Sequence, residues 1–129
     1  MNLIQKAVVK KGDKYLIGLR SENAKYFPLH WDFPGGKLEP DENPLAGIAR
    51  EVKEETGLDI QPLEILGVYE FDLDNKGDNT HRFTIYSTEI ISGDLTLSEE
   101  HIEQRWATKD EICKLKIELY FKPFFKEHS

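Results

Sequence analysis

The sequence predicts a single domain that combines strands and helices, an α/β (α+β) fold built around a mixed or antiparallel sheet. Three observations lead to this prediction: a chain of 129 residues, strand-like runs spread along it, and one segment with a clear helical period. A chain of this size buries about two-thirds of its unfolded surface, which is enough for a hydrophobic core. We therefore expect residues 1–129 to form one domain without an internal repeat or a linker.

Composition and charge exclude several classes of protein. Apolar residues make up 39% of the chain and charged residues 32%, as in ordinary globular domains. The net charge of −7 argues against binding to a nucleic-acid polymer or an anionic membrane, but leaves small phosphorylated molecules open if a cation screens them. Cys113 is the only cysteine, so neither a disulfide within the chain nor a zinc site of several thiolates can form.

The N-terminal run and the lone cysteine favour a cytoplasmic location. Polar residues interrupt the run MNLIQKAVVK, so it lacks the apolar centre of a signal peptide. No stretch approaches the roughly 18 consecutive apolar residues of a membrane-spanning helix. We expect a cytoplasmic protein without a membrane partner, present as a monomer or a homodimer.

The first twenty residues are expected to form a hairpin of two strands. Apolar and β-branched residues at 3–9 and 15–19 flank a polar turn that contains Gly12. This pattern is then lost, and a short apolar run leads into the adjacent glycines Gly35 and Gly36. Paired glycines indicate a place where the backbone needs unusual freedom, so we expect a functional loop there.

The best-defined element is a helix over residues 44–56. Asn43 is a favourable N-cap, Pro44 suits the first helical position, and Gly57 supplies a left-handed stop. Apolar and small residues recur at helical spacing and predict one buried stripe. The residues of the stripe are Leu45, Ile48, Ala49, Val52 and Thr56.

Two long strands are expected after this helix. Residues 60–72 and 82–91 are rich in Ile, Val, Phe, Tyr and Thr, and the polar segment 75–80 lies between them. A polar connection of this kind joins neighbouring antiparallel strands. We therefore expect the two runs to pair with each other.

The last part of the chain predicts one more strand and short helices. The strand surrounds Trp106, and Thr108 offers a helix start directly behind it. Residues 117–125 indicate a helix, or two short helices broken near Pro123.

Three glutamates share one face of the predicted helix. Glu51, Glu54 and Glu55 stand at positions i, i+3 and i+4, which span about 100° of the circumference. Like charges at this spacing repel one another, and a bound divalent cation would remove the repulsion. Oxygen ligands of this kind suit Mg²⁺, or Mn²⁺ in its place, with substrate phosphates completing the coordination. The alternative is a solvated acidic surface on which Arg50 and Lys53 form surface ion pairs.

The residues around this helix match a longer pattern. Residues 36–58 read GKLEPDENPLAGIAREVKEETGL and fit G-x(5)-E-x(7)-R-E-U-x-E-E-x-G-U, in which U is a bulky aliphatic residue. The fixed positions are filled by Gly36, Glu42, Arg50, Glu51, Val52, Glu54, Glu55, Gly57 and Leu58. The segment resembles the signature box of the Nudix hydrolase family, whose members cleave a nucleoside diphosphate linked to another group. The resemblance implies a Nudix-type α/β/α sandwich with a mixed central sheet and a catalytic loop-helix-loop.

The resemblance also implies roles for residues of the box. Glu54 and Glu55 match the principal metal ligands, and Glu51 matches a ligand or a general base. The carbonyl of Gly35 matches a further ligand. Arg50, Glu51 and Glu54 form the expected catalytic set. The residues expected to support the loop and the helix are Gly36, Glu42 and Gly57.

Many members of the family add an acid from a later loop. Here the stretch 97–104 offers Glu99, Glu100 and Glu103. Spacing back from Trp106 favours Glu100 as the additional metal ligand.

The contacts to a substrate are expected from residues outside the box. Arg20, at the end of the second predicted strand, can reach a substrate phosphate. Phe27 and Phe83 are candidates for stacking on a base.

The implied reaction is hydrolysis at phosphorus by a metal-activated water. The run WDFPGGKLEP resembles MutT-type nucleoside triphosphate diphosphatases, including those that remove oxidised guanine nucleotides. A Pro that marks many ADP-ribose hydrolases is replaced by Asp74, and a Tyr that marks dinucleoside polyphosphate hydrolases is missing. We expect a Mg²⁺-dependent pyrophosphohydrolase that converts a nucleoside triphosphate, oxidised or not, to the monophosphate and pyrophosphate. ADP-ribose or another nucleotide sugar is the alternative substrate, and a nucleotide-sensing module without catalysis is the further alternative.

Overall fold

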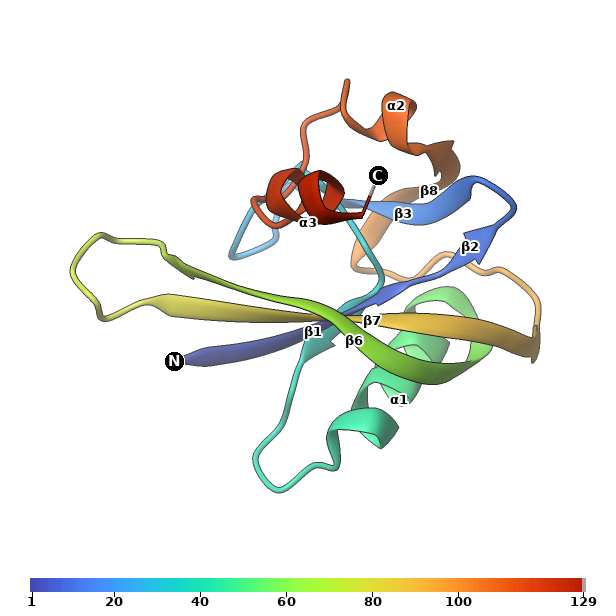
Figure 1. The fold of residues 1–129 in the computed structure, drawn as a ribbon, viewed down its shortest axis with the longest axis horizontal. Helices are drawn as coiled ribbons and strands as arrows, with labels where there is room; N and C mark the ends of the chain where they lie inside the picture. Colours follow the sequence, from blue (N-terminus) through green and yellow to red (C-terminus); the bar gives the residue numbers. More distant parts are fainter. Residues whose placement is uncertain (129) are drawn as a thin grey trace.

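The computed structural model, which describes residues 1–128, has the mixed α+β architecture that the sequence predicts (Figure 1). One sheet crosses the middle of the molecule, with helix α1 on one side and a second sheet with helices α2 and α3 on the other. The elements in chain order are β1 (Asn2–Val8), β2 (Lys10–Lys11), β3 (Lys14–Arg20), β4 (Trp31–Asp32), β5 (Gly35–Lys37), α1 (Pro44–Thr56), β6 (Leu58–Asp72), β7 (Thr80–Gly93), β8 (His101–Thr108), α2 (Lys109–Ile112) and α3 (Phe121–Glu127).

The central sheet is mixed, as expected. Its strand order is β5-β1-β7-β6. Strand β1 runs parallel to β7 and antiparallel to β5, and β6 runs antiparallel to β7. In the second sheet β3 pairs antiparallel with β2, β4 and β8. Helix α1 and the second sheet therefore cover opposite faces of the central sheet, in the layered arrangement that the family resemblance implies.

The predicted hairpin at the N-terminus is only partly correct. The turn at Gly12 exists, with φ at 61°, but it joins β3 to the two-residue strand β2. Strand β1 lies in the other sheet, where β5 and β7 flank it. The chain changes sheets near Val9, whose carbonyl still accepts a hydrogen bond from Leu16 N at 2.9 Å. Local strand patterns were sufficient to find both strands, but not to identify their partners.

Helix α1 has the boundaries that its capping residues predict. The side chain of Asn43 accepts hydrogen bonds from the backbone N–H groups of Leu45 and Ala46, and Gly57 ends the helix with φ at 79°. Ile48 and Val52 are fully buried against the central sheet. Leu45 was expected in the same stripe, but it is 51% exposed because the first turn lies outside both core clusters.

The two faces of the central sheet carry separate cores. On the α1 face, Ile48 and Val52 pack with Tyr86 and other apolar residues. On the opposite face, Phe83 and Ile85 of the same strand β7 pack with aromatic residues of α3. This alternation along β7 is the period of two that a strand buried on both faces requires.

The paired strands β6 and β7 are confirmed, and they are longer than expected. Their antiparallel register runs from Leu58 opposite Gly93 to Asp72 opposite Thr80. The strand around Trp106 and the helix start at Thr108 are also confirmed, and Thr108 forms a capping box with Glu111.

The prediction of a helix over residues 117–125 is partly wrong. Ile117 forms a parallel bridge with Trp31, and α3 begins only at Phe121. Pro123 lies in the first turn of α3, where its missing N–H has no partner in the helix, so it does not break the helix. Within residues 1–128, no helix is long and apolar enough to span a bilayer.

Candidate active site

A glycine pair brings the start of β5 close to α1. Gly35 has φ at 148°, and a Cβ atom there would lie 1.9 Å from the carbonyl oxygen of Gln5. A Cβ atom on Gly36 would lie 2.5 Å from Oε2 of Glu51. At Gly35 only glycine fits, because its positive φ and the Gln5 backbone exclude a side chain. The expected need for backbone freedom is confirmed, but the glycine pair lies in strand β5 and not in a loop.

Glu55 links helix α1 to strand β5. Its carboxylate Oε2 accepts the Gly35 N–H at 3.0 Å, and the residue is 6% exposed. Burial raises the pKa of Glu55 to about 7, against the opposing charge of Lys6. The group therefore exchanges its proton near neutral pH in the absence of a bound cation.

Arg50 holds three carboxylates at once. Its Nε donates to Glu42 at 2.9 Å, Nη1 donates to both oxygens of Glu54 at 3.1 Å, and Nη2 donates to Glu51 at 3.0 Å. The hydrogen bonds to Glu42 and Glu54 raise the pKa of Arg50 above its already high value. Arg50 thus connects the loop before α1 with the acidic face of the helix.

Glu51 is the half-buried member of the acidic face. Burial is the largest cause that raises its pKa, Arg50 opposes the rise, and the negative charges of Glu54 and Glu100 add to it. Its pKa therefore lies above that of an exposed glutamate, which makes it a better proton acceptor than a fully solvated carboxylate.

The later loop contributes Glu100 to the same place. Glu99 and Glu100 line a surface hollow of about 400 Å³ together with Glu51, Glu54 and Glu55. Glu103 lines neither this hollow nor its neighbour, and it pairs instead with Arg105 at 3.2 Å. We call Glu51, Glu54, Glu55 and Glu100 the acidic rim.

The acidic rim fits a divalent cation by its chemistry. It offers only carboxylate oxygens, and the raised pKa values of Glu51 and Glu55 show that neighbouring cations do not fully compensate their burial. Within residues 1–128, no three side chains already stand in the geometry of a metal site, since Arg50 holds the oxygens of Glu54 and one oxygen of Glu51. A Mg²⁺ or Mn²⁺ ion there would compete with Arg50 for these oxygens.

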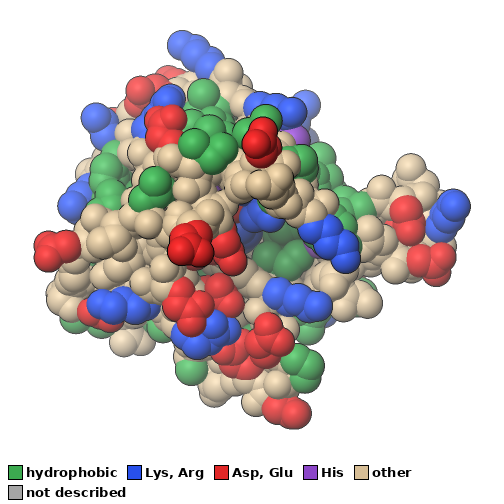
Figure 2. Space-filling view, turned by 180° about the vertical axis from the view of Figure 1, so that it is seen from behind, with side chains coloured by type: hydrophobic (Ala, Val, Ile, Leu, Met, Phe, Trp, Pro, Cys, Tyr) green, Lys and Arg blue, Asp and Glu red, His purple; other side chains and the backbone are tan. Residues whose placement is uncertain are grey.

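A large cavity of about 450 Å³ adjoins the acidic rim. Figure 2 shows acidic side chains at the border of a hollow that contains basic and hydrophobic side chains. Lys25, Lys37 and Arg20 supply positive charge to its lining, while Ile4 and Phe27 are among its apolar residues. A molecule with negative groups at one end and a flat apolar part at the other matches this lining.

The three substrate-binding residues expected from the sequence all line this cavity. Phe27 is partly buried there and its ring contacts His30 edge-on. Phe83 is only 2% exposed, because most of its ring belongs to the core on the α3 face. Arg20 is already held by Asp32 and by the carbonyl of Tyr26, at 3.1 and 3.0 Å. Its position is therefore fixed before any ligand binds.

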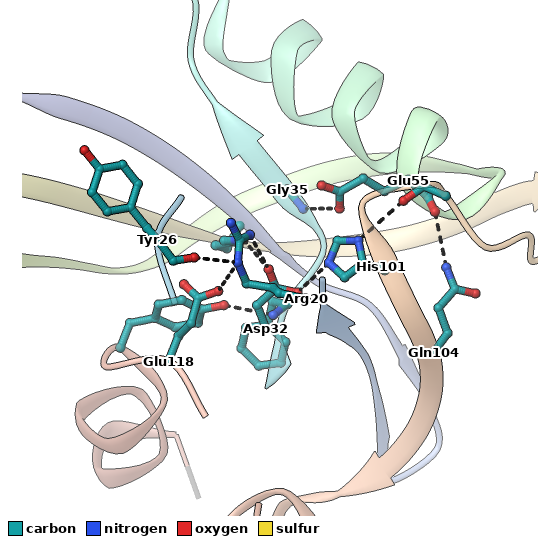
Figure 3. A network of polar contacts seen from close by, with 12 residues as sticks. Arg20, Tyr26, Asp32, Gly35, Glu55, His101, Gln104 and Glu118 are labelled. Carbon is teal, nitrogen blue, oxygen red and sulfur yellow. Dashed lines mark hydrogen bonds and ion pairs between the residues drawn. The ribbon is translucent and has the colours of Figure 1, made fainter. Parts of the chain in front are cut away.

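A buried polar cluster beneath the cavity was not expected from the sequence (Figure 3). Asp32 is 1% exposed. Its carboxylate pairs with Lys6 Nζ at 3.1 Å, Arg20 Nη1 at 3.1 Å and His101 Nε2 at 3.0 Å. Glu118 completes the cluster, with its Oε2 3.8 Å from Arg20 Nε. We call Lys6, Arg20, Asp32, His101 and Glu118 the buried polar cluster.

The charges in this cluster shift each other's titration. Burial alone would raise the pKa of Asp32, but Lys6, His101 and Arg20 lower it well below its usual range. Glu118 behaves in the opposite way: burial raises its pKa to about 8, Lys6 and Arg20 oppose the rise, and the charge and hydrogen bond of Asp32 add to it.

Weak sequence signals for the cluster did exist. Gln5 and Lys6 interrupt the apolar part of β1, and Asp32 stands between Trp31 and Phe33 in a buried run. A charged residue inside an apolar strand indicates a paired buried charge, but nothing in the sequence identifies its partner on another element.

Comparisons with known proteins agree with this architecture. A family model described as NUDIX domain matches residues 6–127. A MutT-like protein from Streptomyces ambofaciens is 34% identical over 116 residues, which cover 88% of this chain and 67% of that protein. An asymmetrical bis(5'-nucleosyl)-tetraphosphatase from Rattus norvegicus is 33% identical over 89 residues, 67% of this chain and 60% of the relative.

A solved structure extends the likeness over nearly the whole fold. The crystal structure of a MutT protein from Methanosarcina mazei Go1 superposes with a TM-score of 0.85 at 33% identity, covering 97% of this chain and 90% of that one. The match includes the loop, the helix and both sheets that form the site. On its box, its fold and its relatives, this chain belongs to the Nudix hydrolase family.

Proposed function

We propose that this chain hydrolyses nucleoside triphosphates to the nucleoside monophosphate and pyrophosphate, with Mg²⁺ or Mn²⁺ as cofactor. The observation that carries the proposal is the continuity of the acidic rim with the large cavity, since Glu51, Glu55 and Glu100 line both hollows. A nucleotide placed along the cavity has its phosphates beside carboxylates that can share a divalent cation. Its base then lies among the apolar side chains.

The residues at this end of the cavity have different expected roles in hydrolysis. A divalent cation, when bound there, would neutralise phosphate charge and lower the pKa of a bound water molecule. Glu51 is suited to accept a proton from the attacking water, because burial raises its pKa. Lys37 lines the cavity directly after the glycine pair and offers positive charge to the phosphates. Glu54 is exposed and can turn from Arg50 toward a cation.

Dinucleoside polyphosphates are a second candidate class of substrate. The supporting observation is the likeness to the rat protein named as a bis(5'-nucleosyl)-tetraphosphatase, although the match covers 60% of that protein. ADP-ribose and other nucleotide sugars are the remaining alternative substrates, and sensing without hydrolysis is the alternative function. We also propose a cytoplasmic location, because the lone cysteine and the polar N-terminal run favour it.

A panel of substrates tests the proposal. Wild-type protein is incubated with the four common nucleoside triphosphates, oxidised nucleotides, a dinucleoside tetraphosphate and ADP-ribose, each with Mg²⁺, Mn²⁺ or EDTA. The proposal predicts metal-dependent release of pyrophosphate from at least one triphosphate and none in EDTA. If only ADP-ribose or the dinucleotide is hydrolysed, that compound and not a triphosphate is the substrate. If nucleotides bind but none is hydrolysed, the protein is a sensor and not an enzyme.

A further inference from the structure

The last turn of α1 is capped by residues from a distant part of the chain. An α-helix leaves its final carbonyl groups without partners inside the helix. In α1 the carbonyl of Thr56 accepts the Thr96 N–H at 2.8 Å, and the carbonyl of Glu55 accepts a hydrogen bond from Nε2 of Gln104 at 3.2 Å. The end of the helix that carries Glu54 and Glu55 is therefore joined to the chain that follows β7.

Gln104 bonds to the helix and to this following segment with one group. Its Nε2 also donates to the carbonyl of Thr96, at 2.7 Å. Both partners are carbonyl oxygens, so only the NH₂ end of the side-chain amide, with its two donors, can face them. Figure 3 shows Gln104 reaching from β8 to the backbone of Glu55. The side chain thus links β8, α1 and the segment 94–100 between β7 and β8.

Hydrogen bonds near its two ends hold the segment 94–100 in place. All of its residues except Ser98 are exposed, so burial of side chains does little to fix its path. Thr96 is bonded to α1 and to Gln104, and the carbonyl of Glu100 accepts the Ser21 N–H at 3.1 Å. The anchor at Thr96 is the one that sets the distance of the segment from the helix.

This distance matters because the segment carries one carboxylate of the acidic rim. Glu100 lines the same hollow as Glu51, Glu54 and Glu55 of the helix. Mg²⁺ demands a nearly ideal octahedral geometry, so carboxylates from two parts of the chain can share it only if those parts keep a fixed spacing. Residues that orient metal ligands from outside typically change metal affinity by about 10- to 100-fold when they are replaced.

We propose that Gln104 is a positioning residue for the acidic rim: its amide holds the segment 94–100 against the last turn of α1, so that Glu100 can share a divalent cation with the helix carboxylates. The inference rests on the proposed function, because it takes the rim as the cation site. Gln104 lines neither the large cavity nor the hollow at the rim. It therefore acts through Glu100 and not by contact with the cation or the substrate.

Binding of Mn²⁺ alone tests this without substrate or turnover. The dissociation constant is measured by electron paramagnetic resonance, in which free Mn²⁺ gives the signal, for wild type, Gln104→Met, Glu100→Gln and the double variant. Gln104→Met nearly keeps the length and volume of the side chain but removes both donors. Gln61→Met is the matched control, because Gln61 is exposed on β6 and lines neither hollow.

The expected result depends on whether Glu100 is present. Gln104→Met should weaken Mn²⁺ binding about tenfold, and Gln61→Met should leave it within about twofold of wild type. Because Gln104 acts through Glu100, the double variant should bind Mn²⁺ within about twofold of Glu100→Gln alone. A general loosening of the fold would instead weaken binding by the same factor with and without Glu100. Gln104→Thr, which suits a strand but is too short to reach the two carbonyls, repeats the comparison if Gln104→Met does not fold.

Three results would overturn the inference. They are a wild-type protein that does not bind Mn²⁺, an unchanged Mn²⁺ affinity in Gln104→Met, and equal losses of affinity with and without Glu100. The proposed hydrolysis is judged separately in the substrate panel. A protein that hydrolyses nothing there can still show the expected Mn²⁺ affinities, and an active enzyme can still lack them.

Discussion

The acidic rim and the buried polar cluster are both dense in charge, but they differ in exposure and in origin. The rim carboxylates Glu51 and Glu54 come from one helix, and Glu54 is 59% exposed at its side chain. Asp32 in the cluster is 1% exposed and joins partners from β1, β3 and β8. Exposure leaves the Glu54 side chain free to turn once Arg50 releases it, whereas Asp32 has almost no freedom.

This difference corresponds to two tasks. Carboxylates that exchange Arg50 for a cation must be able to turn, and exposure allows them to do so. A cavity that selects a ligand must keep its shape, and paired buried charges hold their side chains in a single geometry. Gly18 adds to this rigidity, because a Cβ atom there would lie 2.6 Å from the ring of His101. The comparison predicts that stability depends on the cluster and turnover depends on the rim.

Asp32→Asn is expected to have the largest effect on stability. The substitution keeps the volume but removes the charge that pairs with Lys6, Arg20 and His101, so buried cations lose their partner. We expect the free energy of unfolding to fall by about 3–5 kcal/mol in urea denaturation at pH 7. A loss below about 1 kcal/mol would show that the cluster does not hold the fold.

Glu54→Gln is expected to have the largest effect on turnover with little effect on stability. Glu54 is exposed, so its loss leaves the core intact, but the rim loses a carboxylate that can share a cation. We expect kcat for nucleoside triphosphate hydrolysis to fall at least about a hundredfold, with the melting temperature within about 2 °C of wild type. Glu64→Gln is the control, since Glu64 is exposed on β6 and lines neither hollow. Near-normal kcat in Glu54→Gln would remove Glu54 from the catalytic set.

Glu118→Gln is expected to change how stability depends on pH. The folded protein holds the Glu118 proton up to a pKa of about 8, whereas an unfolded glutamate releases it near 4.5. The stabilising contribution of this group is complete below pH 4.5 and is lost as the pH rises toward 8. Relative to wild type, the variant should gain at least about 1 kcal/mol in free energy of unfolding between pH 5 and pH 8.5. Parallel pH profiles for both proteins would show that Glu118 titrates normally.

Asp59→Asn is expected to have the smallest effect. Asp59 pairs with Lys53 at 3.2 Å on the surface, where both side chains are about half exposed. Water and salt screen such a pair, so the free energy of unfolding should remain within the error of the measurement. A loss comparable to that of Asp32→Asn would contradict the distinction between exposed and buried pairs.

The features predicted well from the sequence are those set by neighbouring residues. Asn43, Pro44 and Gly57 define the ends of α1 by local capping chemistry, and the spacing of Glu51 and Glu54 defines a helix face. The antiparallel pair β6 and β7 is also local, because a short polar loop joins the two strands. These features depend on contacts close in sequence, so the chain itself specifies them.

The features that were missed depend on distant partners. The parallel pairing of β1 with β7 joins Asn2 to His81, and no local pattern indicates it. The same holds for Glu118 and Asp32, which meet only after β4 and the segment before α3 come together. Pro123 was misjudged for another reason, since its effect depends on whether it lies in the first turn of a helix.

Steady-state kinetics on one nucleoside triphosphate test most directly whether the rim and the cavity serve one substrate. The measurement compares kcat and KM for pyrophosphate release by wild type, Glu54→Gln and Phe27→Ala, all with Mg²⁺. We expect Glu54→Gln to lower kcat with KM nearly unchanged, and Phe27→Ala, which removes an aromatic ring from the cavity lining, to raise KM about tenfold with kcat within about threefold. If both variants changed the same parameter, or neither changed any, the division between a reacting end and a binding end would be wrong.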